Sequence, residues 1–177
     1  VELCFSVFGD KAFRRYSIPQ PSKGDGQWQQ ALNRTVFDLQ MVSFADLEKR
    51  QILEASDRIR DAFIELMIHD DYFDECLTKA VADRTKIQYR FDTWQAQLRQ
   101  VLQVQSGEPR FFDMDLKRRK FEDHPVCAIC NQRIHSLDDA HLDHRIPFSK
   151  GGSTDSGNAQ LCHRYCNRVK GSRLSSD

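Results

Sequence analysis

Cys127-Ala-Ile-Cys130, followed after thirty residues by Leu161-Cys-His-Arg-Tyr-Cys166, concentrates the metal-ligating side chains of this chain. Two thiolates three residues apart can bind one tetrahedral ion, so the first stretch predicts a zinc-binding turn. The second stretch offers Cys162, His163 and Cys166 for the two remaining positions. Spacing favours His163 with Cys166, and Cys162 is the leading substitute for His163. We therefore expect a structural zinc ion in a segment too short to build a large core.

The composition indicates a folded protein. The 177 residues are 40% hydrophobic and 29% charged, which excludes a disordered tail or a low-complexity polymer. No apolar run approaches the ~20 residues needed to span a bilayer, so we expect no membrane contact. The chain begins at Val1 without an initiator Met or a signal-peptide pattern, so we expect a fragment of a longer protein. A secreted domain with paired cysteines is the alternative to metal binding, and the lack of a secretory pattern argues against it.

The charge balance hides a basic C-terminal end. The chain has 26 basic and 26 acidic side chains, and a net charge of zero argues against a nucleic-acid partner. Residues 1–110, however, carry 15 basic and 17 acidic side chains, whereas residues 111–177 carry 11 and 9. The excess of positive charge in the second part permits contact with phosphates.

Residues 1–109 predict a mainly helical region. Ser43 and Asp46 resemble a capping box at the start of a helix, and apolar residues continue from Ile52 to Leu66 at helical spacing. A second helix is expected over about 70–82, with Cys76 buried as a small hydrophobe. Residues 86–91 fit a short strand or the start of the helix that follows from residue 92. The break at 106–109 is the expected domain boundary.

Residues 110–177 predict a different architecture. A short charged helix is expected over 113–122 and carries a basic run that could contact phosphates. A strand then ends at Pro147, a Gly151-Gly152 turn follows, and a second strand covers 159–161. A helix is expected from about residue 162 to residue 171. The fold class is therefore α+β, with a helical N-terminal region at 1–109 and a small zinc-stabilised domain at 110–177.

The second part resembles a known family. Asp143-His-Arg-Ile-Pro147, Gly151-Gly152, Asn158 and Cys166-Asn-Arg-Val-Lys-Gly171 together resemble the HNH endonuclease motif of the ββα-metal fold over roughly residues 124–173. Counted from Asn158, the resemblance implies that the third and fourth zinc ligands are His163 and Cys166. The sequence departs from the Cys-only form of the module at His163. It also has Asn167 where many members of the family have His.

The resemblance implies a metal-dependent endonuclease or nickase that hydrolyses DNA. Asp143 and Asn167 would hold one catalytic Mg²⁺ or Mn²⁺ ion, and His144 would be the general base. Asn158 would bridge backbone groups and so orient His144. The predicted phosphate contacts are Arg145, Arg168 and Lys170, and ordinary surface charge is the alternative for each of them.

Two features of the predicted strand leave the catalytic assignment open. Asp143 and His144 are adjacent, and adjacent strand residues point to opposite faces, so the strand must end or bulge at this point. His141 shares the face of Asp143 and is therefore a rival base or ligand.

A weaker resemblance concerns the first part of the chain. The segment Ala31-Leu-Asn-Arg-Thr-Val-Phe-Asp-Leu39 and the helices after it resemble the region that precedes HNH modules in bacterial restriction and anti-phage defence proteins. In those proteins a ParB-like nucleotide-binding domain comes first. The resemblance implies a bacterial, cytoplasmic protein that acts on DNA, with an upstream nucleotide-binding domain or a homodimer as further partners. The alternatives are a non-catalytic zinc-stabilised DNA-binding module and an RNA-cleaving nuclease toxin.

Overall fold

The computed structural model describes residues 1–17, 26–103 and 112–171. These residues form two compact units. Residues 1–17 and 28–103 belong to the first, and residues 26–27 and 112–171 belong to the second. The boundary expected at 106–109 lies outside the described residues. No helix in the described ranges is both long and apolar enough to cross a membrane.

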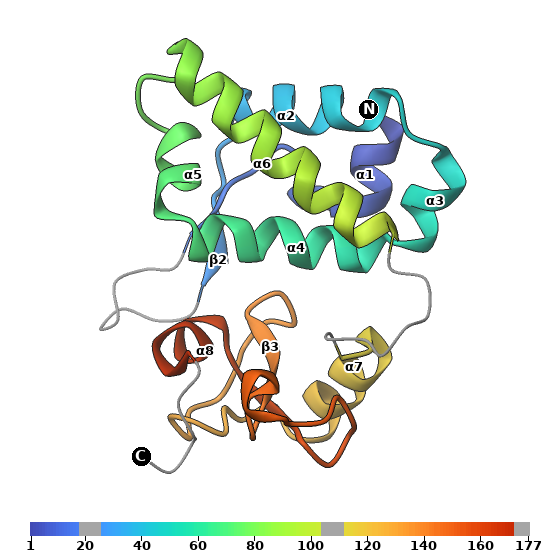
Figure 1. Ribbon diagram of the computed structural model, residues 1–177, viewed down its shortest axis with the longest axis vertical. Helices are drawn as coiled ribbons and strands as arrows, with labels where there is room; N and C mark the ends of the chain where they lie inside the picture. The colour runs from blue at the N-terminus through green and yellow to red at the C-terminus, as the bar shows by residue number, and fades with distance from the viewer. Residues whose placement is uncertain (18–25, 104–111, 172–177) are drawn as a thin grey trace. The chain divides into compact units, whose positions relative to one another are not determined.

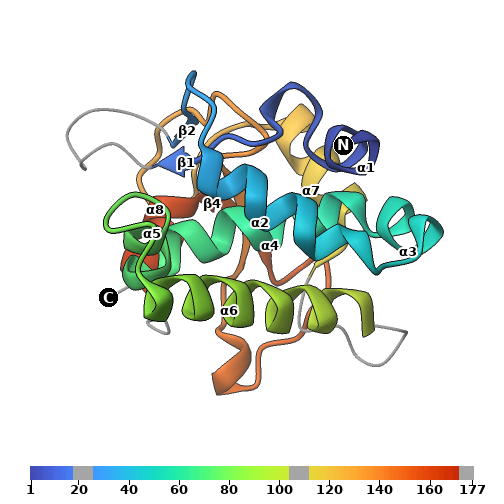
Figure 2. The same cartoon turned by 90° about the horizontal axis from the view of Figure 1, so that it is seen from above.

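The first unit is built from helices and one short sheet (Figures 1 and 2). The sheet pairs β1 (Tyr16–Ser17) with β2 (Gln27–Trp28). The helical elements are α1 (Glu2–Phe8), the 3₁₀ turn η1 (Gly9–Lys11), α2 (Arg34–Ala45), α3 (Lys49–Glu54), α4 (Ser56–His69), α5 (Asp71–Cys76) and α6 (Arg84–Gln103).

Aromatic and aliphatic side chains form the core of this unit. Phe63 of α4 and Trp94 of α6 are fully buried, and their ring centroids lie 4.8 Å apart in an edge-to-face arrangement. Such pairs add about 0.5–1.5 kcal/mol beyond the burial of their area. Cys76 is also fully buried, as expected for a small hydrophobe. These contacts hold α6 against α4, which α6 crosses at an angle in Figure 1.

Three boundaries in this unit differ from the sequence prediction. Ser43 does not start a helix, because α2 begins earlier, at Arg34, and Asn33 caps it by accepting a hydrogen bond from Val36 N on Oδ1 at 3.0 Å. The apolar run from Ile52 to Leu66 is divided at Ala55 into α3 and α4. The helix expected over 70–82 ends at Cys76. Residues 86–91 lie inside α6, which confirms the second of their two alternatives, the start of a helix.

The second unit contains α7 (Met114–Asp123), β3 (Ala140–His144), the 3₁₀ turn η2 (Phe148–Lys150), β4 (Ala159–His163) and α8 (Arg164–Lys170). β3 and β4 are antiparallel, and their register pairs Ala140 with His163 and His144 with Ala159. One face of this pair packs against a small core that includes Ile134, Leu142 and Leu161. The order strand, loop, strand, helix confirms the predicted α+β class.

Candidate functional site

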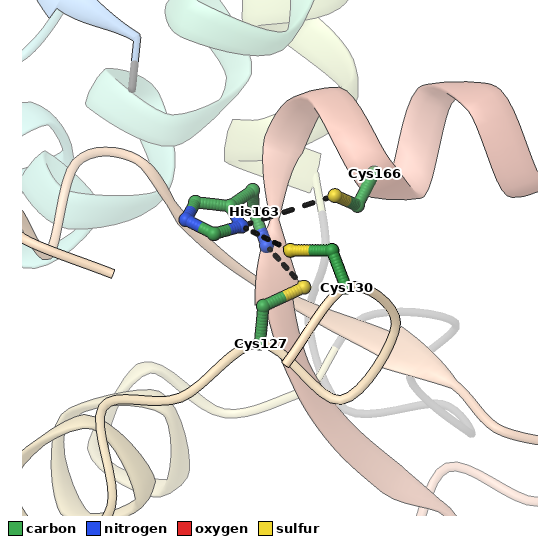
Figure 3. Close-up of side chains that lie close together, drawn as sticks. All are labelled: Cys127, Cys130, His163 and Cys166. Carbon is green, nitrogen blue, oxygen red and sulfur yellow. Dashed lines mark hydrogen bonds between the residues drawn. The ribbon is translucent and has the colours of Figure 1, made fainter. Parts of the chain in front are cut away.

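Four side chains converge at one end of β4 (Figure 3). Cys127 and Cys130 come from a tight turn, His163 is the last residue of β4, and Cys166 lies in the first turn of α8. Their ligand atoms all lie within 4.8 Å of one another. Atoms bound to one tetrahedral zinc ion at about 2.3 Å lie roughly 3.8 Å apart, so the cluster fits a zinc-binding site.

Backbone groups support the sulfur atoms of this cluster. The N–H groups of Ile129 and His163 point at Cys127 Sγ, at 3.4 and 3.5 Å. Asn131 closes the turn with a φ of 59°, a conformation that Asn adopts more readily than most residues. Ala128 N donates to Leu161 O at 2.8 Å and ties the turn to β4. The turn is therefore held against the strand that provides His163.

Cys162 lies outside the cluster. Its side chain is fully buried, and Sγ lies 3.6 Å from the carbonyl oxygen of His141. Successive strand residues point to opposite faces, so His163 and Cys162 cannot both face the turn. The structure therefore brings together the four residues that sequence spacing favoured, and it leaves Cys162, the predicted substitute for His163, outside the cluster.

The ionisation of the cluster in the absence of an ion follows from its contacts. The hydrogen bond with the Cys127 thiolate raises the pKa of His163 to about 9, although burial acts in the opposite direction. Burial alone would raise the pKa of Cys127, but hydrogen bonds from His163 and from backbone N–H groups lower it to about 6. Burial and the neighbouring sulfurs raise the pKa of Cys166. The site therefore stabilises a thiolate beside an imidazolium.

His144 is the last residue of β3, at the opposite end of the strand pair from His163. Its Nε2 lies 3.0 Å from Thr154 Oγ1. The Phe112 ring packs on the imidazole with a centroid distance of 4.3 Å, and Phe148 meets it edge-on at 5.8 Å. The ring is therefore fixed by a hydroxyl and two aromatic side chains, which the sequence did not identify.

Asn158 ties together the loop between β3 and β4. Its Oδ1 accepts a hydrogen bond from Ile146 N at 2.8 Å, and its Nδ2 donates to Ile146 O at 3.0 Å and to Ser153 O at 2.8 Å. Gly152 passes so close to this bridge that an added Cβ would lie 1.8 Å from Ile146 O. The loop after His144 is therefore closed by one amide and by a position that only glycine fits.

Asp143 is buried and points toward α8. Its Oδ2 accepts hydrogen bonds from Gln160 Nε2 at 2.7 Å and from Lys170 Nζ at 2.9 Å. Lys170 Nζ also donates to the carbonyl oxygen of His144 at 3.1 Å. The strand ends at His144, as the adjacency of the two predicted catalytic residues required. Lys170 therefore contacts both residues from α8.

The remaining predicted residues lie around this group. Asn167 is half-buried in α8, three residues before Lys170, and α8 packs against β3. Arg145 and Arg168 are exposed, whereas Lys170 is buried. Of the three predicted phosphate contacts, two are therefore at the surface and one is inside the site.

A comparison with known protein families finds a match within the second unit. Residues 126–173 match the family model described as HNH endonuclease. The match includes the cluster of three cysteines and His163, together with β3, β4 and α8, and it does not extend into the first unit. No curated protein and no solved structure matches the chain.

Proposed function

We propose that the chain is a metal-dependent HNH endonuclease or nickase that hydrolyses phosphodiester bonds of DNA, with His144 as the general base. The observation that carries this proposal is the position of Lys170. Its Nζ donates to the Asp143 carboxylate at 2.9 Å and to the His144 carbonyl oxygen at 3.1 Å, and these contacts support a single site built from the motif residues of β3 and the end of α8.

The oxygen donors of this site fit one Mg²⁺ or Mn²⁺ ion. Asp143 offers a carboxylate, and Asn167 offers an amide oxygen, which are the ligand types that these hard cations prefer. Asp143 Oδ2 already faces the positive charge of Lys170. Asn167 lies three residues before Lys170, and helical residues at that spacing share a face. When bound, the ion would neutralise charge on the phosphate and stabilise the leaving oxygen.

His144 takes the proton of the attacking water in this proposal. An imidazole accepts protons near neutral pH, and general-base catalysis contributes typically 10²–10⁴-fold to a rate. The contacts with Phe112 and Thr154 restrict the ring to one orientation. Asn158 holds the loop that carries Thr154, so its role is to position the base.

The exposed guanidinium groups of Arg145 and Arg168 are suited to contact phosphates beside the site. Arg145 directly follows His144 in the chain, and Arg168 directly follows Asn167. Contacts with DNA phosphates fix the position of a protein on the duplex without reading the base sequence. We assign DNA contact to these two residues.

The cluster of Cys127, Cys130, His163 and Cys166 would hold a structural zinc ion. Its four ligand positions are all filled by protein atoms, which is typical of structural sites and leaves no position for a water. The ion would fix the turn, the end of β4 and the start of α8. Hydrolysis is assigned to the other end of the strand pair.

The wider setting rests on the weaker resemblance of residues 31–39. It supports the effector part of a bacterial restriction or phage-defence protein that works in the cytoplasm. An upstream nucleotide-binding domain would then provide selectivity for the DNA target. A second copy of the chain would cut the other DNA strand.

The proposal is tested by incubating the chain with supercoiled plasmid and either Mg²⁺ or Mn²⁺. We expect nicked or linear product, and we expect His144→Ala to lower the rate by about 10²–10⁴-fold. Cleavage at an unchanged rate by His144→Ala would exclude the assigned base. The ratio of nicked to linear product distinguishes a nickase from a double-strand endonuclease.

Two alternatives have distinct outcomes in the same assay. A DNA-binding module without catalysis would retard DNA in a gel and leave the plasmid intact with both metals. An RNA-cleaving toxin would degrade labelled single-stranded RNA at a much higher rate than DNA. The pairing of Asp143 and His144 in one site favours catalysis, because binding alone does not need both residues.

A further inference from the structure

Asp139 is a buried acid beside the cysteine cluster. It lies in the turn before β3, and its side chain is only 1% exposed. Its backbone is fixed on both sides, because its N–H donates to Ser136 O at 3.1 Å and its carbonyl oxygen accepts from Arg164 N at 3.0 Å. Burying a carboxylate is costly unless it has partners. A carboxylate held this firmly therefore needs an explanation.

The two carboxylate oxygens of Asp139 have different surroundings. Oδ1 accepts a hydrogen bond from the backbone N–H of Gly26 at 3.2 Å, from a residue 113 positions away in the sequence. Oδ2 lies 4.0 Å from Nε2 of His163. The first contact holds the carboxylate in place, and the second directs it at the imidazole.

The two nitrogens of His163 face opposite environments. Nδ1 faces the sulfurs, at 3.4 Å from Cys130 Sγ and 3.8 Å from Cys166 Sγ. Nε2 faces oxygen atoms, at 3.3 Å from Arg133 O and 4.0 Å from Asp139 Oδ2. An imidazole that binds a metal through one nitrogen carries its proton on the other, where acceptors orient the ring.

We infer that Asp139 is a positioning residue of the zinc centre, which orients His163 so that Nδ1 binds the ion. The Arg133 carbonyl oxygen accepts the Nε2 proton at 3.3 Å, and the negative charge of the Asp139 carboxylate, 4.0 Å from Nε2, favours that proton position and strengthens Nδ1 as a ligand. The inference rests on the zinc centre proposed above and does not depend on nuclease activity. It also gives a reason for the burial of an acid that lies outside the motif residues.

The test measures the zinc affinity of the full chain by competition with a chromophoric chelator. We expect Asp139→Asn and Asp139→Ala to weaken zinc binding by about 10–100-fold, which is the usual effect of removing such a partner. Asp138→Asn is the matched control, because it removes the same charge one residue away. We expect the control to bind zinc within about threefold of the wild type. Equal affinities for wild type and both Asp139 variants would overturn the inference.

A second readout requires no variant. In the zinc-loaded wild-type chain, the ring ¹⁵N resonances of His163 should show a metal-bound Nδ1 and a protonated Nε2. Zinc on Nε2, or a wild-type chain that binds no zinc, would overturn the inference even if Asp139→Ala fails to fold. Absence of plasmid cleavage affects neither readout, so the nuclease proposal and this one can fail separately.

Discussion

Lys170 Nζ lies 2.9 Å from Asp143 Oδ2, and the two side chains are only 4% and 10% exposed. The pair joins the end of α8 to the last residues of β3. In the proposed nuclease, Asp143 also holds the catalytic cation, so Lys170 supplies positive charge to the carboxylate when no divalent ion is bound. Within that proposal, the buried pair favours a role for Lys170 beside Asp143 over the phosphate contact predicted from sequence.

Replacing Lys170 by Met tests the pair. Removing one partner of a buried ion pair leaves an uncompensated charge and costs about 3–5 kcal/mol. We expect the thermal unfolding midpoint of Lys170→Met to fall, and Mg²⁺ or Mn²⁺ to recover part of the loss by occupying the carboxylate. Arg168→Met is the control, because that residue is exposed. Equal stability of the two variants would show that the pair contributes little.

The cysteine variants test the zinc ligands. Cys127→Ser removes a ligand and should release zinc and unfold the second unit, because a structural ion contributes directly to folding. Cys162→Ser should keep one zinc per chain, since Cys162 Sγ lies against the His141 carbonyl oxygen. Elemental analysis and circular dichroism measure both outcomes. Loss of zinc from Cys162→Ser but not from His163→Ala would refute the ligand assignment.

Zinc affinity should depend on pH. In the ion-free protein, His163 has a pKa of about 9 and the pKa of Cys166 is raised, so both carry protons at pH 7. Both must lose them to bind zinc, whereas Cys127, with a pKa of about 6, is already mostly ionised. Lowering the pH from 9 to 6 should therefore weaken zinc binding steadily. Calorimetry in buffers of different ionisation enthalpy would measure the released protons, and a constant dissociation constant would contradict the expectation.

Gly152→Ala tests the closed loop after His144. The added Cβ would lie 1.8 Å from Ile146 O and 2.8 Å from Asn158 Nδ2, so the backbone bridge must move. We expect a loss of about 1–3 kcal/mol of stability and a clear fall in cleavage rate, with zinc retained. Gly157→Ala is the control, because its nearest neighbour is the exposed Asp155 carboxylate at 3.1 Å. Cleavage and unfolding curves for the two variants should therefore differ.

The sequence predicted the cysteine cluster because its information is local. Cys127 and Cys130 are close enough in sequence to share one turn, and His163 and Cys166 are close enough to share the junction between β4 and α8. Helix boundaries in the first unit were harder to predict, because apolar spacing continues across the division between α3 and α4 and no Gly or Pro marks it. The start of α2 depends on Asn33, a capping residue outside the run of apolar residues that suggested a helix.

Residues that act through distant contacts could not be predicted. Asp139 meets Gly26 across 113 positions, and no spacing rule connects them. Lys170 resembles other basic residues in its segment, and only the packing of α8 against β3 buries it. Phe112 lies outside the motif residues and reaches His144 only in the folded chain.

The pairing of β3 with β4 connects the cysteine cluster to the residues around His144. His163 faces Ala140 at one end of the two strands, and His144 faces Ala159 at the other. A slip of one residue would turn every side chain to the opposite face and would separate Asp143 from Lys170. Such a slip would also pull His163 away from its three cysteines. An ion bound there would therefore fix the alignment of the two strands, about 14 Å from His144, the residue proposed as the base.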